Sequence, residues 1–477
     1  MIRRLLSWHE DPALVDRFRT AAGRVLLLLC TAPLLPPDER WPMLAALAFL
    51  FSFPQRRMEI LALGGLWVLY RWLPPAEGGG IPWTLAGMAA ILGFLYLGFV
   101  AARRFREAPA VFRRWPIAWT HLAVLCLLLA AAAPAALGAA VPDPVRAATE
   151  AVRALILFLL WRVSYMVLSG KRGSAAGTRF RDHLCYCLPV WGGTFTPYGK
   201  GHDYLAGQRK DDDRELAQTR LAGLKLLMLA WLWTKALFFF NAVTVGSRAP
   251  YIGSLPDGWS LGLPGLTTAI GTGPAPYGAG GCWIILLAEF VRATLRMAIH
   301  GHVVIGILRL AGFRVFRNTY KPLLSRSIVE FWNRYYYYFK ELLVEFFFYP
   351  VFMATNGRTR QVRIALAVLA AATFGNLYFH LVRDHAAYFL HGPWTMADRV
   401  AGRAVYCAAL GIGIVVSMLR EQRRRGASAP EGKRRAAELR AIAGVWLFFS
   451  LLQVWGAGLE EVTLGERWRF FLGLFGL

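Results

Sequence analysis

Long apolar blocks dominate the chain, and charged residues are largely confined to the stretches between them. The clearest blocks are residues 81–102, 117–137, 221–245, 282–313, 364–382, 401–419 and 442–454. A helix needs roughly 20 apolar residues to cross a bilayer, and most of these blocks are near that length. Including shorter blocks such as residues 21–35 and 41–53, we expect about eleven or twelve transmembrane or re-entrant helices. The pattern predicts an all-α, polytopic integral membrane bundle.

Composition agrees with a membrane protein, because 56% of the 477 residues are hydrophobic and 14% are aromatic. The sequence has no internal repeat of fixed period, and no long linker divides it into separate domains. We therefore expect one integral membrane domain over residues 1–477, with a polar cytoplasmic stretch at 169–220 and a basic loop at 420–440.

The net charge of +25 is concentrated in alternate loops. Basic residues gather at positions 103–114, 171–181, 309–326, 358–363 and 420–440, whereas 74–82, 134–144, 249–281 and 385–397 are nearly free of them. The positive-inside rule then places the amino terminus and the basic loops in the cytoplasm. The expected location is the cell (inner) membrane, which the chain would cross several times. Attraction to anionic lipids accounts for the remaining charge, so we expect membrane lipids as partners and no nucleic acid.

The segment 325–349 is both aromatic and charged. On one continuous helix, its polar residues would share an arc of about 120°; they are Glu330, Asn333, Arg334, Tyr337, Glu341 and Glu345. Basic loops flank the segment on both sides, so we expect it to lie along the membrane or to dip in and return. Its polar face either meets water at the interface or lines an active-site funnel, and the three glutamates favour the funnel.

The block 364–382 contains a histidine at membrane depth. Thr373, Asn376 and His380 recur at three and four residues and therefore share one helix face, which Asp384 continues one turn later. A histidine exchanges a proton near neutral pH. Asp384 could orient the imidazole, or Arg383 could pair with that carboxylate instead. The simpler alternative is a histidine that only hydrogen-bonds between helices.

A third polar face lies in the block 282–313, where Glu289, Arg292, Arg296 and His300 recur at three, four and four residues. Each charge facing lipid would cost about 2.5–3.5 kcal/mol, so we expect these charges to pair inside the protein. They form either a structural network or a positive patch that meets an anionic substrate.

We expect no metal ion. His183, Cys185, Cys187 and His202 carry suitable atoms for binding one, but their spacing is not that of a zinc site.

The residues Ser325 to Pro350, with Glu330-Phe-Trp-Asn-Arg334, an aromatic run and Tyr349-Pro350, resemble the signature segment of membrane-bound O-acyltransferases. Gly375-Asn-Leu-Tyr-Phe-His380 resembles the later histidine segment of that family, so the likeness covers 325–384. Two positions depart from the family pattern: Tyr336 stands where bacterial members carry a second polar catalytic residue, and Phe379 replaces a tryptophan.

The resemblance implies a core with a central funnel and an O-acyltransferase in which His380 is the general base. Asn376, Asn333 and Tyr336 would be the other catalytic residues, as donors to the oxyanion. The expected substrate contacts are Glu330, Arg334, Tyr337, Glu341, Arg296, His300 and Asp384.

No cofactor is expected to be bound, and acyl-CoA or an acyl-carrier thioester would be the cytoplasmic co-substrate. The acceptor would be a glycan, glycolipid or lipid, and an extracytoplasmic partner protein is a further candidate partner. The alternatives are a transporter or flippase of lipid-linked glycans and a non-catalytic membrane protein with the same fold.

Overall fold

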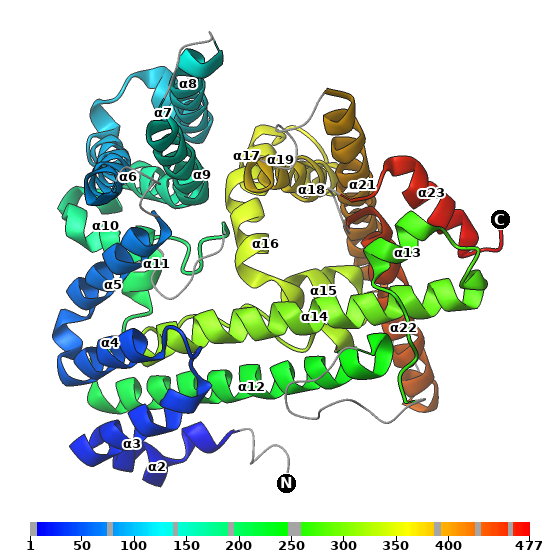
Figure 1. Ribbon diagram of the computed structural model, residues 1–477, viewed down its shortest axis with the longest axis horizontal. Coiled ribbons are helices and arrows are strands. Elements are labelled where there is room, and N and C mark those ends of the chain that lie inside the picture. The colour runs from blue at the N-terminus through cyan, green and yellow to red at the C-terminus, as the bar shows by residue number, and fades with distance from the viewer. Residues whose placement is uncertain are drawn as a thin grey trace. The chain divides into compact units, whose positions relative to one another are not determined.

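The computed structural model of the protein describes residues 7–73, 80–136, 142–188, 195–246, 259–385, 393–424, 431–456 and 461–477. Within these ranges the chain is helical, with one isolated antiparallel bridge between Arg209 and Phe313 and no strand (Figure 1). The all-α prediction is therefore confirmed.

Six helices in the described ranges are long and apolar enough to cross a membrane. They are Ile81–Arg103, Val145–Arg172, Asp213–Val245, Arg360–Arg383, Trp394–Gln422 and Arg435–Gly456. Shorter apolar helices are Ala21–Leu34, Arg40–Ser52 and Pro116–Ala131. Helix length and composition thus support a polytopic membrane protein. The central funnel and the larger number of spans stay predictions.

The chain divides into two compact units. Unit 1 comprises Met1–Met228 and Val303–Phe316, and unit 2 comprises Leu229–His302 and Arg317–Leu477. All the residues predicted for the site belong to unit 2. The single membrane domain over 1–477 stays a prediction.

Unit 1 consists of short and long helices packed through small residues. Its elements are α2 (Pro12–Arg19), α3 (Ala21–Thr31), α4 (Arg40–Ser52), α5 (Arg57–Trp72), α6 (Gly80–Arg103), α7 (Ala110–Arg114), α8 (Pro116–Ala136), α9 (Asp143–Arg172), α10 (Phe180–Cys187), α11 (His202–Gly207) and the first half of α12 (Asp213–Val245). A Cβ at Gly170 of α9 would lie 2.2 Å from the carbonyl oxygen of Ala102 on α6. Only glycine allows this close approach, which is typical of packed membrane helices.

Arg57 ties the polar stretch 169–220 into unit 1. Its guanidinium is buried and donates to the carbonyl oxygens of Lys210 (2.8 Å) and Gly312 (3.2 Å) and to the carboxylate of Asp211 (3.0 Å). A buried charge needs such partners, so this part of the stretch is an integral piece of the fold. Residues 189–194 of the stretch, and 425–430 of the basic loop 420–440, lie outside the described residues.

Unit 2 carries the second half of α12 and the elements around the predicted site. They are α13 (Leu266–Thr272), α14 (Gly278–Leu310, to His302), α15 (Ile328–Tyr335), α16 (Tyr337–Leu343), α17 (Tyr349–Ala354), α18 (Arg360–Leu369), α19 (Asn376–Arg383), α21 (Pro393–Arg424), α22 (Glu431–Gly456) and α23 (Leu464–Gly473). Stacked rings form one core of this unit: the ring centres of Phe331 and Phe449 are 3.8 Å apart, and those of Phe290 and Phe331 are 5.7 Å apart. This core joins α14, α15 and α22.

The segment 325–349 is not the single continuous helix assumed for its polar arc. The backbone leaves the helical region at Tyr336 (φ −144°, ψ 76°), which separates α15 from α16. A neighbouring loop bonds to both sides of this break: the backbone N–H of Tyr337 donates to the carbonyl of Asn318 (2.9 Å), and that of Tyr320 donates to the carbonyl of Arg334 (2.8 Å). The break turns α16 away from α15, so the polar residues do not share one helix face (Figure 1).

Two π-helical turns lie where the segment after α16 meets the next span. They are Val344–Phe348 and Ala370–Gly375, and they pack against each other. A Cβ at Gly375 would lie 2.5 Å from Cδ2 of Phe347, so any larger residue at this position would force the Phe347 ring or the backbone to shift. Such turns insert one extra residue into a helix and are frequent at functional sites. The second of them leads directly into the predicted histidine segment.

Candidate functional site

The histidine segment is held against α21. The span runs from α18 through the π turn into α19, and Thr373 in the turn donates its hydroxyl to the carbonyl of Cys407 (3.3 Å). A Cβ at Gly411 of α21 would lie 2.2 Å from Oγ1 of Thr373, so this glycine permits the approach. Figure 1 shows α18 and α19 beside α21, whose residues therefore face the predicted catalytic segment.

His380 is buried, with 8% of its surface exposed, and aromatic rings surround it. The ring centres of Phe339, Phe379 and Tyr406 lie 6.4, 5.9 and 6.5 Å from that of the imidazole. These rings come from α16, α19 and α21. The histidine thus lies inside unit 2, not on its surface.

The carboxylate of Asp384 lies next to the imidazole. Its Oδ2 is 3.5 Å from Nδ1 of His380, which is within ion-pair distance, but Nδ1 has no hydrogen-bond partner among the described residues. The backbone N–H of Asp384 donates to the carbonyl of His380 (2.8 Å), which closes the last turn of α19. Arg383 donates to both carboxylate oxygens, at 2.6 and 2.7 Å. Both partners considered for Asp384 are therefore present, and the paired guanidinium is the closer one.

The pKa of Asp384 is lowered from its usual value. Burial acts to raise the pKa of this carboxyl, but the neighbouring imidazole and the Arg383 guanidinium outweigh burial. Asp384 is thus an anion at neutral pH, which is the form that can orient the Nδ1–H group of a neutral histidine.

A second arginine, which the sequence analysis did not select, completes this cluster. Nη2 of Arg403 lies 4.0 Å from Oδ2 of Asp384, and the guanidinium carbon lies 5.7 Å from the ring centre of Tyr406. Arg399 and Arg403 are one turn apart at the start of the apolar span of α21, and both are buried. Arginines inside a span were the available signal, because charges at membrane depth usually have a function.

Asn376 lies one helical turn before His380 and is 1% exposed. Neither its Oδ1 nor its Nδ2 has a hydrogen-bond partner among the residues that the structure describes. An unsatisfied buried polar group costs about 1–3 kcal/mol, so such a group is retained when something else supplies the bond. Asn376 is therefore suited to bind a polar group of a substrate.

The other two predicted oxyanion donors are placed differently. Asn333 is exposed on α15. The ring of Tyr336 lies 5.3 Å from that of Phe339, and Phe339 in turn lies 4.6 Å from Phe379. Tyr336 is thus connected to the histidine segment through aromatic packing, whereas the exposed Asn333 has no such connection.

Four of the predicted substrate contacts have local partners. Glu330 forms an i,i+4 ion pair with Arg334 (2.6 Å) and also accepts from the backbone N–H of Arg326 (2.6 Å). Glu341 pairs with Lys340, whose Nζ lies 4.8 Å from the ring centre of Tyr337. These contacts hold the segment in place, and a role in substrate binding stays a prediction for each.

On the charged face of α14, Glu289 and Arg292 are paired inside the protein, as predicted, whereas Arg296 pairs with Glu289 but has an exposed side chain. Glu289 accepts from both Arg292 and Arg296, and Arg292 also donates to Asn241 (2.8 Å) and Thr244 (3.3 Å) on α12. This arrangement favours the structural network over a free positive patch. A substrate contact of Arg296 or of His300, one turn further along α14, stays a prediction.

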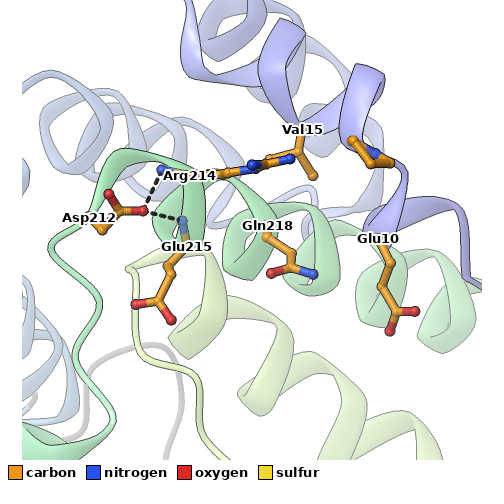
Figure 2. A pocket seen from close by; sticks show the side chains of 7 residues that line it. Glu10, Val15, Asp212, Arg214, Glu215 and Gln218 are labelled. Carbon is orange, nitrogen blue, oxygen red and sulfur yellow. Dashed lines mark hydrogen bonds between the residues drawn. The ribbon is translucent and has the colours of Figure 1, made fainter.

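A cavity of about 280 Å³ lies in unit 1, away from these residues in sequence (Figure 2). Glu10, Pro12, Val15, Asp212, Arg214, Glu215 and Gln218 line it. Asp212 accepts from the backbone N–H groups of Arg214 (3.0 Å) and Glu215 (2.9 Å) at the start of α12, so this carboxylate serves as a helix cap. None of the residues predicted for the site lines this cavity.

Among the described residues no three His, Cys, Asp or Glu side chains come together as a metal site would require. A comparison with known protein families found no matching family model, and a comparison with curated proteins found no match. The functional reading therefore rests on the residues and their geometry.

Proposed function

We propose that the protein is a membrane-embedded acyltransferase that moves an acyl group from a thioester to a hydroxyl, with His380 as the general base. The observation that carries the proposal is the buried His380 with Asp384 facing its Nδ1 at 3.5 Å. A neutral imidazole that directs Nδ1–H to a carboxylate presents Nε2 as the proton acceptor. The likeness of residues 325–384 to membrane-bound O-acyltransferases names the acyl-transfer chemistry.

In this reaction the acceptor hydroxyl gives its proton to Nε2 of His380 while its oxygen attacks the thioester carbonyl carbon. A C–O bond forms and a tetrahedral oxyanion develops on the former carbonyl. The C–S bond then breaks, and the imidazolium returns the proton to the leaving sulfur. A positioned general base contributes about 10²–10⁴-fold to such a step.

Asn376 is the best-placed donor to the developing oxyanion. Its amide is buried one turn from His380, and its Nδ2 has no partner among the described residues. A preorganised donor in a buried site stabilises the charge without reorganisation. Tyr336 and Asn333 are secondary candidates, because the first reaches the histidine through Phe339 and the second is exposed.

The resemblance to membrane-bound O-acyltransferases implies a cytoplasmic acyl-CoA or carrier thioester, and the alternation of basic loops supports an acceptor that arrives from the other side. His380 lies near the end of a span that begins after the basic loop 358–363, so it belongs to the outer half of the membrane. A cell-surface glycan or glycolipid is the first candidate acceptor, and a lipid is the second. With the same topology we propose a cytoplasmic amino terminus, and a location in the cell (inner) membrane is part of the proposal.

The decisive experiment is transfer of radiolabelled acetyl-CoA to acceptors by the purified full-length protein in nanodiscs. A neutral glycan, an anionic glycan and a lipid alcohol are offered in turn. We expect labelled acceptor with the wild type and a loss of about 10²–10⁴-fold in His380→Ala and His380→Asn. Retained turnover in both variants would refute the base assignment.

His302→Asn is the matched control. His302 is also buried at 8% exposure in unit 2, but its Nδ1 faces the carbonyl of Ala298 on its own helix. This variant is expected to keep full transfer. The same protein is also reconstituted in sealed liposomes, where movement of substrate across the membrane without covalent change would favour a transporter. If neither label transfer nor movement occurs, the protein is a non-catalytic membrane protein.

A further inference from the structure

Positive side chains outnumber negative ones beside His380. Two guanidinium groups, of Arg383 and Arg403, surround the single carboxylate of Asp384. Arg383 occupies both carboxylate oxygens at 2.6 and 2.7 Å, whereas Arg403 reaches only one of them, at 4.0 Å. One carboxylate therefore serves two cations, and the nearer one takes most of its hydrogen-bonding capacity.

Arg403 is left short of partners although its side chain is only 7% exposed. Its Nε has no hydrogen-bond partner in the described part of the chain, and its other contact is the face of Tyr406. A buried cation without full compensation is costly unless a counter-charge arrives. A ligand that supplied the counter-charge would therefore recover this cost.

Arg467 shows how the backbone of this unit can satisfy a buried arginine. It is 2% exposed, and it donates to the backbone carbonyls of Val454 (2.7 Å) and Val462 (3.4 Å). Backbone carbonyls could have completed Arg403 in the same way. Its incomplete shell thus distinguishes Arg403 from Arg467 of the same unit.

We infer that Arg403 binds an oxyanion, a carboxylate or a phosphate, carried by the molecule that enters beside His380. The guanidinium edge formed by Nε and one Nη fits two oxygens of such a group. Asn376, whose amide is also unpartnered, lies on the same helix as His380 and stays assigned to the oxyanion of the thioester, so Arg403 is the group left for the anion of the acceptor. The anion site therefore selects a negatively charged acceptor.

This inference rests on the proposed function only in calling the bound molecule the acceptor. Binding itself is measured without turnover, by calorimetry on the full-length protein in nanodiscs at constant ionic strength. The probes are glucuronate for the carboxylate, glucose 6-phosphate for the phosphate, glucose as the neutral sugar, and coenzyme A for the donor. We expect one or both sugar anions to bind and glucose not to bind.

Arg403→Gln should weaken anion binding about tenfold or more, and Arg403→Lys should weaken it less, because lysine keeps the charge but not the two-oxygen fork. Arg326→Gln, on the surface where Arg326 pairs with Glu438 at 2.9 Å, is the control and should bind as the wild type does. Asp384→Asn should bind the anion at least as tightly, since the competing carboxylate is gone. If Arg403→Gln does not fold, the inference is tested by the ratio of the anion dissociation constants of Arg403→Lys and the wild type.

Equal binding of glucose and its charged relatives, or unchanged anion affinity in the Arg403 variants, would overturn the inference. Binding of coenzyme A alone would also overturn it, because the arginine would then serve the donor. Anion binding that depends on Arg403, with no label transfer in any assay, would uphold the site while refuting the acyltransferase.

Discussion

At the residue scale, the carboxylate of Asp384 contacts two groups that compete for it. It faces Nδ1 of His380 at 3.5 Å, and it also neutralises Arg383 through two hydrogen bonds. The stronger pairing with Arg383 fixes the carboxylate in place, so the position of Asp384 relative to the imidazole depends on the arginine. Arg383 is thereby a positioning residue for the proposed base.

Asp384→Asn tests this arrangement through acyl transfer. The amide keeps the size of the side chain but loses the negative charge that orients the Nδ1–H group, so kcat should fall while KM for the thioester changes little. The fall should stay below the loss in His380→Ala, about 10²–10⁴-fold, because the base itself remains. An unchanged kcat would show that Asp384 only pairs with arginines.

The burial of His183, in the polar stretch of unit 1, leads us to expect that the stability of the protein depends on pH. The side chain is buried, its Nε2 lies 2.8 Å from the hydroxyl of Thr178, and its ring centre is 4.9 Å from that of His202. Burial, and to a lesser degree His202, lower the pKa of His183 to about 4. The unfolded chain, with an ordinary histidine pKa of about 6.5, therefore binds the proton more tightly.

The contribution of His183 to stability is complete above about pH 6.5 and is lost as the pH falls from there toward 4. Thermal unfolding of the wild type and of His183→Gln, which keeps a hydrogen-bonding group, should converge on acidification over this range. Carboxylates that titrate in both proteins cancel in the comparison. If the difference in unfolding midpoint between the two proteins stays constant with pH, His183 is not a buried neutral histidine.

At the scale of elements, the glycine contacts decide how closely the site segments approach. Gly375 packs against Phe347 where the two π turns meet. This contact cannot be predicted from the sequence, because the two residues are 28 positions apart and lie in different helical segments. Hydrophobic periodicity predicts an ordinary helix over 364–382, and it cannot reveal a π turn that depends on a contact with another helix. The element was thus predictable, and its internal turn was not.

Gly375→Ala should destabilise the protein by about 1–3 kcal/mol, as an overpacked contact does, because the added Cβ would lie 2.5 Å from the Phe347 ring. Gly444→Ala on α22 is the control, since a Cβ there meets nothing within 4 Å. Thermal unfolding in nanodiscs should show a lower midpoint for the first variant and an unchanged or higher one for the second. A Gly375→Ala midpoint equal to the control would contradict the packing.

In the candidate site, too, local spacing was predictable from the sequence and tertiary contacts were not. Spacing alone predicted that Asn376, His380 and Asp384 follow one another by single turns, and the structure has the first two on α19 and Asp384 at its C-terminal cap. Arg403 could not be joined to them from sequence, because α21 meets α19 through tertiary packing. The polar arc across Tyr336 failed for a related reason: backbone bonds from residues 318–320 hold the chain in a break that helical periodicity cannot register.

At the scale of the whole molecule, loop charge predicts which ends of the helices face the cytoplasm. In a variant without native cysteines, we expect Arg358→Cys to react with a membrane-impermeant maleimide only after permeabilisation. Ser260→Cys, in the loop 249–281 with few basic residues, should react in intact cells. The reverse pattern would invert the topology and place His380 toward the cytoplasm.

The π turn before α19 has one more consequence, which concerns insertions and deletions. Because Ala370–Gly375 accommodates one residue more than an α-helix would, removing a single residue there could restore regular α-helical bonding. The same deletion in the regular α-helical part of the span would instead rotate one side relative to the other by about 100° and move it along the axis by about 1.5 Å. The π turn is therefore the place where this span can lose one residue while its lipid-facing side and its reactive end keep nearly the same relative orientation.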